Sequence, residues 1–209
     1  MKKPGLAVII SSPSGTGKTT ICHELIDNND DFMYSISATT RDPRGQEKNG
    51  VDYLFMTPEQ FANAKDNNEF IESAEYIGNW YGTPQKPLLD AINNGKVVLL
   101  DIDIQGGRSI KEHLPEAVAV FILPPSLEEL KKRLIGRQTE NSKAVDERLW
   151  KALEELKAWN EYDYAVVNDN LEKAVNQVAT IIEVERSKTK RKIDKEYWND
   201  SLKNLLGLT

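Results

Sequence analysis

The chain has 209 residues, of which 39% are hydrophobic and 29% charged, and this composition is ordinary for a single soluble globular domain. The net charge of −6 lacks the basic excess of duplex-binding proteins, so we expect no nucleic-acid polymer as a partner. We also expect no membrane span and no signal peptide, because no apolar run is long enough. The lone Cys22 excludes an internal disulfide and predicts a reducing, cytoplasmic location.

Strands and helices are expected to alternate along the chain. Residues 6–10 form an apolar run typical of a strand buried on both faces, and a glycine-rich turn and a helix at about 18–27 follow. Further strands are expected at 34–37, 96–101, 117–123 and 164–168. This alternation predicts an α/β fold with a doubly wound, five-stranded parallel sheet, which binds ligands at the carboxyl ends of its strands.

Capping patterns in the sequence predict where several helices begin. Ser126 and Glu129 have the spacing of a capping box, and so do Thr57 and Gln60. Apolar residues recur at three- and four-residue steps over 145–156, which predicts an amphipathic helix.

Two segments interrupt the alternation and divide the one predicted domain (residues 1–209) into parts. Residues 38–83 are polar and aromatic and suggest an inserted lobe, while the charged residues 136–148 suggest a mobile cover. We therefore expect a core, an acceptor lobe and a helical lid at the following positions: core about 1–37, 84–125 and 159–209; lobe about 38–83; lid about 126–158.

Residues 11–20, the phosphate loop, follow the first strand and open a helix. The phosphate-loop pattern requires glycine, four residues, Gly-Lys and then Ser or Thr, and Gly17-Lys18-Thr19 fits its end. Ser12 stands where the first glycine belongs. If that position needs a positive φ, the serine costs about 1–2 kcal/mol. A Gly/Ser turn with a chance lysine is the alternative, but the flanking strand and helix argue against it.

The residue types in the loop suit a nucleotide triphosphate. Gly15 and Gly17 let backbone N–H groups turn toward phosphate oxygens, at the positive end of a helix. Lys18 is placed to contact the terminal phosphates, and Thr19 to bind magnesium. Asp101 ends an apolar strand, where a carboxylate can orient that magnesium through water, although a plain helix cap is the alternative.

The predicted lobe gathers groups suited to a second phosphorylated substrate. Arg41 and Arg44 are three residues apart and together suit a phosphate dianion. Tyr53 and Tyr81 can donate phenolic hydrogen bonds, and Glu72 can accept two N–H groups from a base edge. Any one of these alone is more simply explained as a polar group exposed on the surface; together in one insertion they favour a site.

Three arginines bracket the predicted cover. Arg133 and Arg137 share a helical face, and Arg148 follows on the next helix. A closing lid can bring all three over a transferred phosphoryl group and exclude water. The alternative is a solvated helix face.

Other charged or titratable residues suggest no chemistry. His23 and His113 have no second ligand type at metal-ligand spacing, so we expect both on helix surfaces. The basic segment 186–195 is interpreted as a solvated face of a C-terminal helix.

Taken together, the order of these residues resembles the guanylate kinase family, in register over about residues 6–170. The motifs that carry the resemblance are Ser37-x-Thr-Thr-Arg41-x-Pro-Arg44, Gly50-Val-Asp-Tyr53, Glu69-Phe-Ile-Glu72, Gly78-Asn-Trp-Tyr81-Gly-Thr83, Asp101-Ile-Asp103-x-Gln-Gly, Arg133-x-x-x-Arg137 and Asn168-Asp169. The resemblance implies transfer of the γ-phosphoryl group of ATP to GMP or dGMP, with magnesium. We expect either a monomer or a homodimer.

The resemblance also assigns the site residues. It implies that ATP binds Ser12, Pro13, Ser14, Gly15, Thr16, Gly17, Lys18, Thr19 and Thr20, with Asn168 and Asp169 bordering the adenine. It implies that the guanine is read by Ser37, Glu72 and Thr83, with Asp103 close to its amino group and Asp101 nearby, and that the GMP phosphate is held by Arg41, Arg44, Tyr53 and Tyr81. The implied catalytic set is Lys18, Arg44, Arg133, Arg137 and Arg148, and magnesium would be held by Thr19 and, through water, Asp101.

Two rival functions remain at this point. Scaffold domains related to guanylate kinases bind without catalysis, but they tend to lose the loop lysine and lid arginines that this chain keeps. A kinase for another phosphorylated small molecule is the second rival. The carboxylate of Glu72 argues against it, because guanine offers the N1–H and N2–H₂ donors that adenine lacks.

Overall fold

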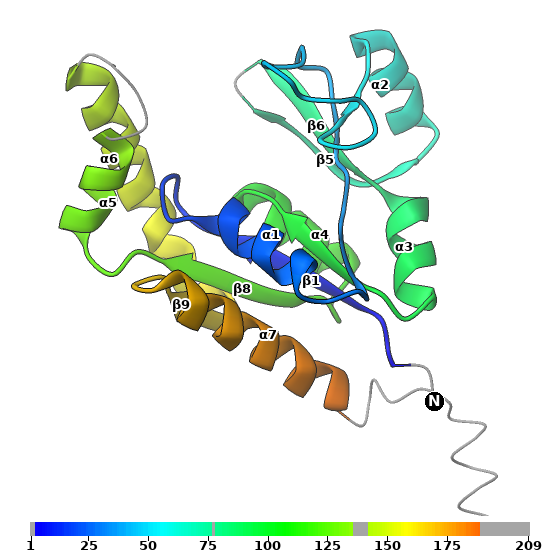
Figure 1. Ribbon diagram of the computed structural model, residues 1–209. Coiled ribbons are helices and arrows are strands. Elements are labelled where there is room, and N and C mark those ends of the chain that lie inside the picture. Colours follow the sequence, from blue (N-terminus) through cyan, green and yellow to red (C-terminus); the bar gives the residue numbers. More distant parts are fainter. Residues whose placement is uncertain (1–2, 77, 136–141, 189–209) are drawn as a thin grey trace, which may run out of the picture.

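A five-stranded parallel sheet with helices on both faces forms the centre of the protein (Figure 1). The structure is a computed structural model that describes residues 3–76, 78–135 and 142–188. The sheet has the order β2-β7-β1-β8-β9, and every neighbouring pair is parallel. Its strands are β1 (Leu6–Ser11), β2 (Phe32–Tyr34), β7 (Val97–Asp101), β8 (Val118–Leu123) and β9 (Tyr164–Val167). This confirms the predicted fold class.

One strand boundary was predicted wrongly. The strand expected at 34–37 is β2 at Phe32–Tyr34. Beyond it, the backbone N–H of Ser35 still donates to Leu99 O at 2.9 Å, and the chain then leaves the sheet for the lobe. The sequence pattern misses this because the apolar residue that anchors β2 in the core is Phe32, which precedes the predicted range.

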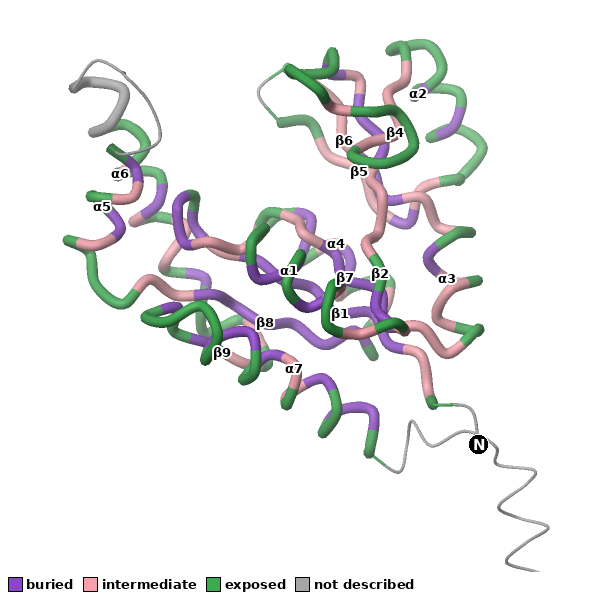
Figure 2. The backbone as a smooth tube through the Cα atoms, viewed as in Figure 1, coloured by how far each residue is buried: buried purple, intermediate pink, exposed green. Residues whose placement is uncertain are grey.

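The central strand β1 is buried on both faces because successive side chains alternate between two cores. Figure 2 shows it as an unbroken buried segment. Its even-numbered residues from Leu6 to Ile10 pack toward α1 (Lys18–Asp27) and α7 (Leu171–Ser187). Its odd-numbered residues pack toward α3 (Gln85–Asn93) and α4 (Ile104–His113). Cys22 of α1 is a free cysteine buried in the first of these cores.

The predicted lobe is a second, smaller sheet that stands above one end of the core (Figure 1). Its order is β4-β3-β6-β5. The elements are β3 (Ala38–Thr39), β4 (Leu54–Phe55), α2 (Pro58–Asp66), β5 (Phe70–Tyr76) and β6 (Asn79–Pro84). The rings of Phe61 and Phe70 stack at 4.6 Å and hold α2 on the sheet. The predicted capping box at Thr57 and Gln60 is confirmed in both directions.

The predicted lid is a helical hairpin, α5 (Leu127–Ile135) and α6 (Ser142–Leu156), followed by the short helix η1 (Lys157–Glu161). Ser126 caps α5 as predicted, accepting from the Glu129 N–H at 3.1 Å. The two helices pack through a small apolar cluster around Leu130 and Leu134, and stand across the core from the lobe (Figure 1). The predicted cover lies partly outside the described residues and, from Ser142 onward, belongs to α6.

No helix among the described residues is both long enough and apolar enough to cross a membrane. His23 and His113 are exposed on helices, as predicted.

Arg186, by contrast, was predicted wrongly as part of a solvated face. It is 3% exposed and donates to Pro4 O (2.8 Å), Asp31 Oδ2 (2.7 Å) and Gly95 O (3.1 Å). Each acceptor lies just before a strand, so one guanidinium satisfies buried groups at the amino ends of β1, β2 and β7. Residues 189–195 of the basic segment lie outside the described residues.

We expect Arg186→Met to lower the free energy of unfolding by about 3 kcal/mol, because two carbonyls and a carboxylate lose their donor. Urea unfolding followed by circular dichroism measures this. Lys86→Met is the matched control: its ion pair with Asp90 is exposed to solvent, so the free energy of unfolding should change little. Equal effects of the two substitutions on the free energy of unfolding would contradict the stabilising role of the buried Arg186 guanidinium.

Candidate active site

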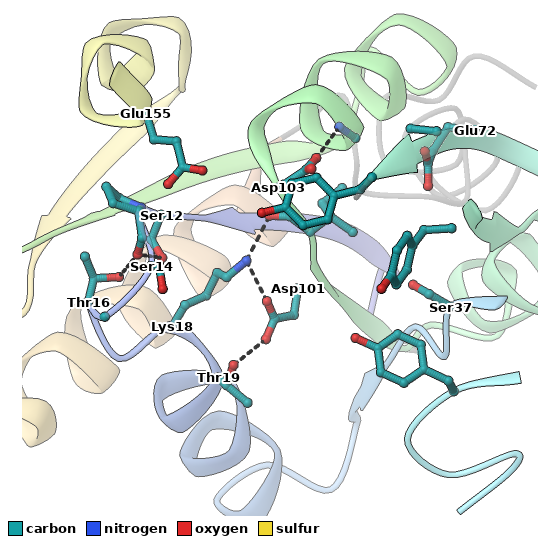
Figure 3. A pocket seen from close by; sticks show the side chains of 18 of the residues that line it. Ser12, Ser14, Thr16, Lys18, Thr19, Ser37, Glu72, Asp101, Asp103 and Glu155 are labelled. Carbon is teal, nitrogen blue, oxygen red and sulfur yellow. Dashed lines mark hydrogen bonds and ion pairs between the residues drawn. The ribbon is translucent and has the colours of Figure 1, made fainter. Parts of the chain in front are cut away.

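A cavity of about 390 Å³ opens where the phosphate loop, the lobe and the lid meet (Figure 3). It lies at the carboxyl ends of β1 and β7, as the fold class predicted. Phosphate-loop residues 12–19 line one wall, and Glu72 and Tyr81 of the lobe line another. Asp101 lies between the two walls, and Glu155 of the lid also lines the cavity. Loop and lobe therefore share one space.

The backbone of the phosphate loop removes the doubt about Ser12. Gly15 and Gly17 both have φ of +90°, a conformation that glycine adopts without strain. Among the described residues, Asn68 alone has a positive φ without being glycine. Ser12 therefore keeps an ordinary backbone conformation, and the conditional strain expected from the missing glycine is not present.

Asn168 supports the loop from beneath. It is 6% exposed, and its amide donates to Thr16 O at 2.7 Å. A Cβ built on Gly17 would lie 2.6 Å from the Asn168 Nδ2, so any other residue here would displace this amide and would be strained at a φ of +90°. The neighbouring Asp169 is exposed. The predicted contact of this pair with adenine stays a prediction.

The carboxylate of Asp101 contacts both Lys18 and Thr19 of the phosphate loop (Figure 3). Lys18 Nζ lies 2.7 Å from its Oδ1 and donates to Ile102 O at 2.9 Å. The Thr19 hydroxyl donates to Asp101 Oδ2 at 3.0 Å. Asp101 thus lies beside Lys18 and Thr19 of the phosphate loop rather than in a helix cap.

The oxygen atoms of Thr19 and Asp101 suit magnesium. A hydroxyl and a carboxylate are hard oxygen ligands, and magnesium normally takes its remaining ligands from water and substrate phosphates. The described residues contain no cluster of three or more His, Cys, Asp or Glu that could form an all-protein cage. The donor set therefore fits a metal held mainly by a nucleotide.

Across the cavity, Glu72 and Thr83 form a pair. The Thr83 hydroxyl donates to Glu72 Oε1 at 2.6 Å, and Thr83 is fully buried. Burial raises the pKa of the Glu72 carboxyl, the Thr83 hydrogen bond opposes the rise, and the negative charge of Asp103 adds to it. Asp103 itself caps α4, accepting from the Gly106 N–H at 2.8 Å. Ser37 lines the same cavity.

Arg41 is held by a residue that the sequence analysis missed. Both terminal nitrogens of Arg41 donate to the carboxylate of Glu47, each at 3.0 Å. Glu47 also accepts from the backbone N–H of Arg44 at 2.7 Å. The Arg41 guanidinium, 9% exposed, lies 5.3 Å from the Tyr53 ring centroid. Nothing in the spacing of Glu47 within a polar loop marks it as the partner of Arg41.

Two tyrosines complete the lobe side. The rings of Tyr53 and Tyr81 meet edge-on at 6.2 Å, and both line the cavity. The Arg44 side chain is exposed. The lobe therefore brings Arg41, Tyr53 and Tyr81 together, and the role of Arg44 beside them stays a prediction.

The two lid arginines that the structure describes, Arg133 and Arg148, do not line the cavity. Arg133 Nε donates to Glu129 at 3.0 Å, and its terminal nitrogen to Asn168 O at 3.4 Å. Arg148 is exposed on α6, and Arg137 lies outside the described residues. The lid residue that does line the cavity is Glu155, seven positions after Arg148 and therefore on the same helical face. That spacing is the sequence signal that could have found it.

A strand, a phosphate loop, a helix and a carboxylate on the adjacent strand define the phosphate-loop kinases. The inserted lobe, with Glu72 and its tyrosines lining the same cavity, is what a nucleoside monophosphate kinase requires.

Comparison with known proteins narrows the class to one family. The guanylate kinase family model matches residues 5–185. The chain is 46% identical to the guanylate kinase of Clostridium acetobutylicum over 91% of both chains, and 46% identical to that of Clostridium tetani over 90% of this chain and 89% of the other. The crystal structure of guanylate kinase from Anaplasma phagocytophilum superposes with a TM-score of 0.79 at 35% identity over 96% of both chains. The chain belongs to the guanylate kinase family.

We expect Ser12→Gly to lower the free energy of unfolding by about 0.5–1 kcal/mol, because glycine gains nothing at an ordinary φ and loosens the unfolded chain. The KM for ATP should change by less than about threefold, since no strain is relieved. Urea unfolding and steady-state kinetics check both. A stabilised variant with much tighter ATP use would show that the serine is strained after all.

We expect Glu72→Gln to raise the Tm at pH 7. The carboxyl has a raised pKa in the folded state, so its ionisation disfavours folding: stability is greatest below the unfolded pKa and falls as pH rises through the folded one. Glutamine does not ionise but can still accept from Thr83. The Tm advantage over the parent, measured by calorimetry from pH 7 to 4, should shrink on acidification. An advantage that is constant with pH would argue against the burial of a charge.

Proposed function

We propose that this cavity carries the transfer of the γ-phosphoryl group of ATP to GMP or dGMP, giving ADP and GDP or dGDP. The observation that carries the proposal is that the phosphate loop and Glu72 line a single cavity, so a donor phosphate and an acceptor nucleotide can meet there. This reaction is a phosphoryl transfer in purine nucleotide metabolism.

The lobe would bind GMP at two ends. Glu72 accepts from the N1–H and N2–H₂ groups of guanine, with Asp103 close to the amino group and Ser37 and Thr83 beside the base. Because Glu72 is largely buried, a base without those donors would leave a desolvated carboxylate unpaired. The GMP phosphate would be held by the four residues of the lobe's other end, Arg41, Arg44, Tyr53 and Tyr81.

Glu47 has a defined part in this arrangement. Its two oxygens fix the guanidinium plane of Arg41, so the arginine is oriented before substrate arrives. Its negative charge also offsets part of the positive charge that the GMP phosphate meets. Arg44, whose side chain is exposed, supplies the additional cation.

The phosphate loop would bind ATP. Backbone N–H groups of the loop, which Pro13 lacks, would face the phosphates, and Lys18 would neutralise the terminal ones. Asn168 keeps the loop in shape through Thr16 O, and Asp169 borders the adenine. Magnesium would be held by Thr19 and, through water, by Asp101; when bound, it neutralises charge on the transferring phosphates.

The transfer itself needs no general base, because the attacking phosphate oxygen of GMP is already anionic. Catalysis then rests on bringing two anions together and neutralising them. Lys18 and Arg44 act from the core and the lobe, while Arg133, Arg137 and Arg148 act from the lid. Closure of the lid over both substrates would exclude water and limit hydrolysis of ATP.

A cytoplasmic location and a monomeric or homodimeric state remain predictions from the sequence. No nucleic-acid polymer is required by any part of the proposed site.

A panel of monophosphates tests the proposal. With ATP and magnesium, GMP and dGMP should be converted to diphosphates with a kcat/KM at least about a hundredfold above AMP, UMP and dTMP. Diphosphate product is quantified by chromatography. Similar rates for all five would overturn the guanine assignment, and binding of GMP without any product would favour a binding module.

We expect Glu72→Ala to lower kcat/KM for GMP by about a hundredfold, because two charge-assisted hydrogen bonds of about 1.5 kcal/mol each are lost. The dissociation constant for ATP, measured by calorimetry, should stay within about twofold. Glu75→Ala, on the exposed side of the same strand, is the matched control. Equal loss of GMP and ATP binding would contradict the assigned role.

A further inference from the structure

The inner face of the lid carries two charged residues beyond the arginines. Arg148, Lys151 and Glu155 are spaced by three and four positions on α6, so all three share one face of the helix. Lys151 and Glu155 also form an ion pair, with 3.9 Å between Nζ and Oε1. The two side chains are therefore neighbours along the helix.

Lys151 reaches from the lid to the acceptor lobe. Its Nζ donates a hydrogen bond to the Tyr76 hydroxyl and lies 4.0 Å from the centroid of the Tyr76 ring. Tyr76 is the last residue of β5, in the lobe, and also lines the cavity. One lysine thus links two parts of the chain that are joined to the core by separate connections.

Glu155 reaches the other way, to the phosphate loop. In Figure 3 its carboxylate points from α6 toward the loop at Ser12 and Ser14. Glu155 and both serines line the cavity. Burial raises the pKa of the Glu155 carboxyl, while Lys151 and the Ser14 backbone N–H oppose the rise. Side chains of α6 therefore reach both the lobe and the cavity wall formed by the phosphate loop.

Each end of this series touches one substrate's site. Tyr76 packs edge-on against Tyr81 at 6.4 Å, and Tyr81 belongs to the proposed GMP phosphate site. Ser14 belongs to the ATP loop. The side chains of Lys151 and Glu155 are 47% and 24% exposed, so the lysine contact is weak enough to form and break as the lid moves.

We propose that Lys151 is a positioning residue that docks the lid on the acceptor lobe through Tyr76 while Glu155 holds the lid to the phosphate loop, so that binding of one substrate strengthens binding of the other. The inference rests on the proposed function of the cavity. Neither residue needs to touch the reacting atoms; the pair sets the lid position that both substrates favour.

The test is the coupling between the two substrates. Calorimetry measures the dissociation constant for GMP, first without ATP and then with a saturating non-hydrolysable ATP analogue plus magnesium. The coupling factor is the first value divided by the second. For Lys151→Met, which keeps much of the side-chain length, the factor should fall about two- to fivefold, the size of an exposed cation contact. GMP binding alone should stay within about twofold.

Matched variants separate this role from a general loss of structure. Lys151→Arg keeps the cation and the donor and should restore most of the coupling. Lys157→Met, the same substitution at an exposed lysine that pairs with Glu154, should leave the coupling factor unchanged. Tyr76→Phe combined with Lys151→Met should lose less than the sum of the two single effects.

The outcomes distinguish the two levels of the argument. A parent protein that forms no GDP overturns the proposed function. A parent that forms GDP, but whose coupling factor is one or is unaffected by Lys151→Met, overturns the docking role alone. A loss in Lys157→Met equal to that in Lys151→Met would do the same, because it would trace the effect to lid charge in general.

Discussion

The contact between Lys18 and Asp101 depends on the register of the central sheet, and the site depends on that contact. Ile10 pairs with Asp101 across β1 and β7, so the phosphate loop that leaves β1 begins beside the carboxylate that ends β7. From there Lys18 and Thr19 each reach one oxygen of the same side chain. A slip of one residue would turn Asp101 to the other face of the sheet and separate the three groups.

The two ends of the central sheet differ in how their polar groups are paired. At the amino ends, Arg186 satisfies the carbonyls of Pro4 and Gly95, and this end is closed and structural. At the carboxyl ends, polar groups face a cavity, and across it burial raises the pKa of the Glu72 carboxyl. Rigidity at one end lets the other carry groups whose burial costs stability, a division common in enzymes.

Much of the fold could be predicted from local pattern, because apolar runs mark buried strands and side-chain oxygens mark helix starts. The capping box at Thr57 and the phosphate loop before Lys18 could both be predicted without any tertiary information. The misses have a common cause. Burial of Arg186, the pairing of Glu47 with Arg41, and the contact of Lys151 with Tyr76 join residues that no periodicity relates. The ordinary φ of Ser12 could likewise not be read from its identity.

The resemblance supplied the roles of the site residues, while the structure supplied their neighbours. The structure places Asn168 against Thr16 and Gly17 of the phosphate loop, and Glu155 on the cavity wall. These neighbours carry no chemistry of their own, but they fix where the chemical groups can stand. The resemblance alone places Asn168 beside the adenine and assigns no role to Glu155.

The buried thiol of Cys22 has a practical consequence for following the lid. Burial raises its pKa to about 12, so the only cysteine of the chain is a poor nucleophile at neutral pH. Cysteines introduced on the exposed faces of the lobe and the lid could then be labelled selectively in the otherwise native protein. A pair of fluorophores at such positions would report the distance between lobe and lid directly as nucleotides are added.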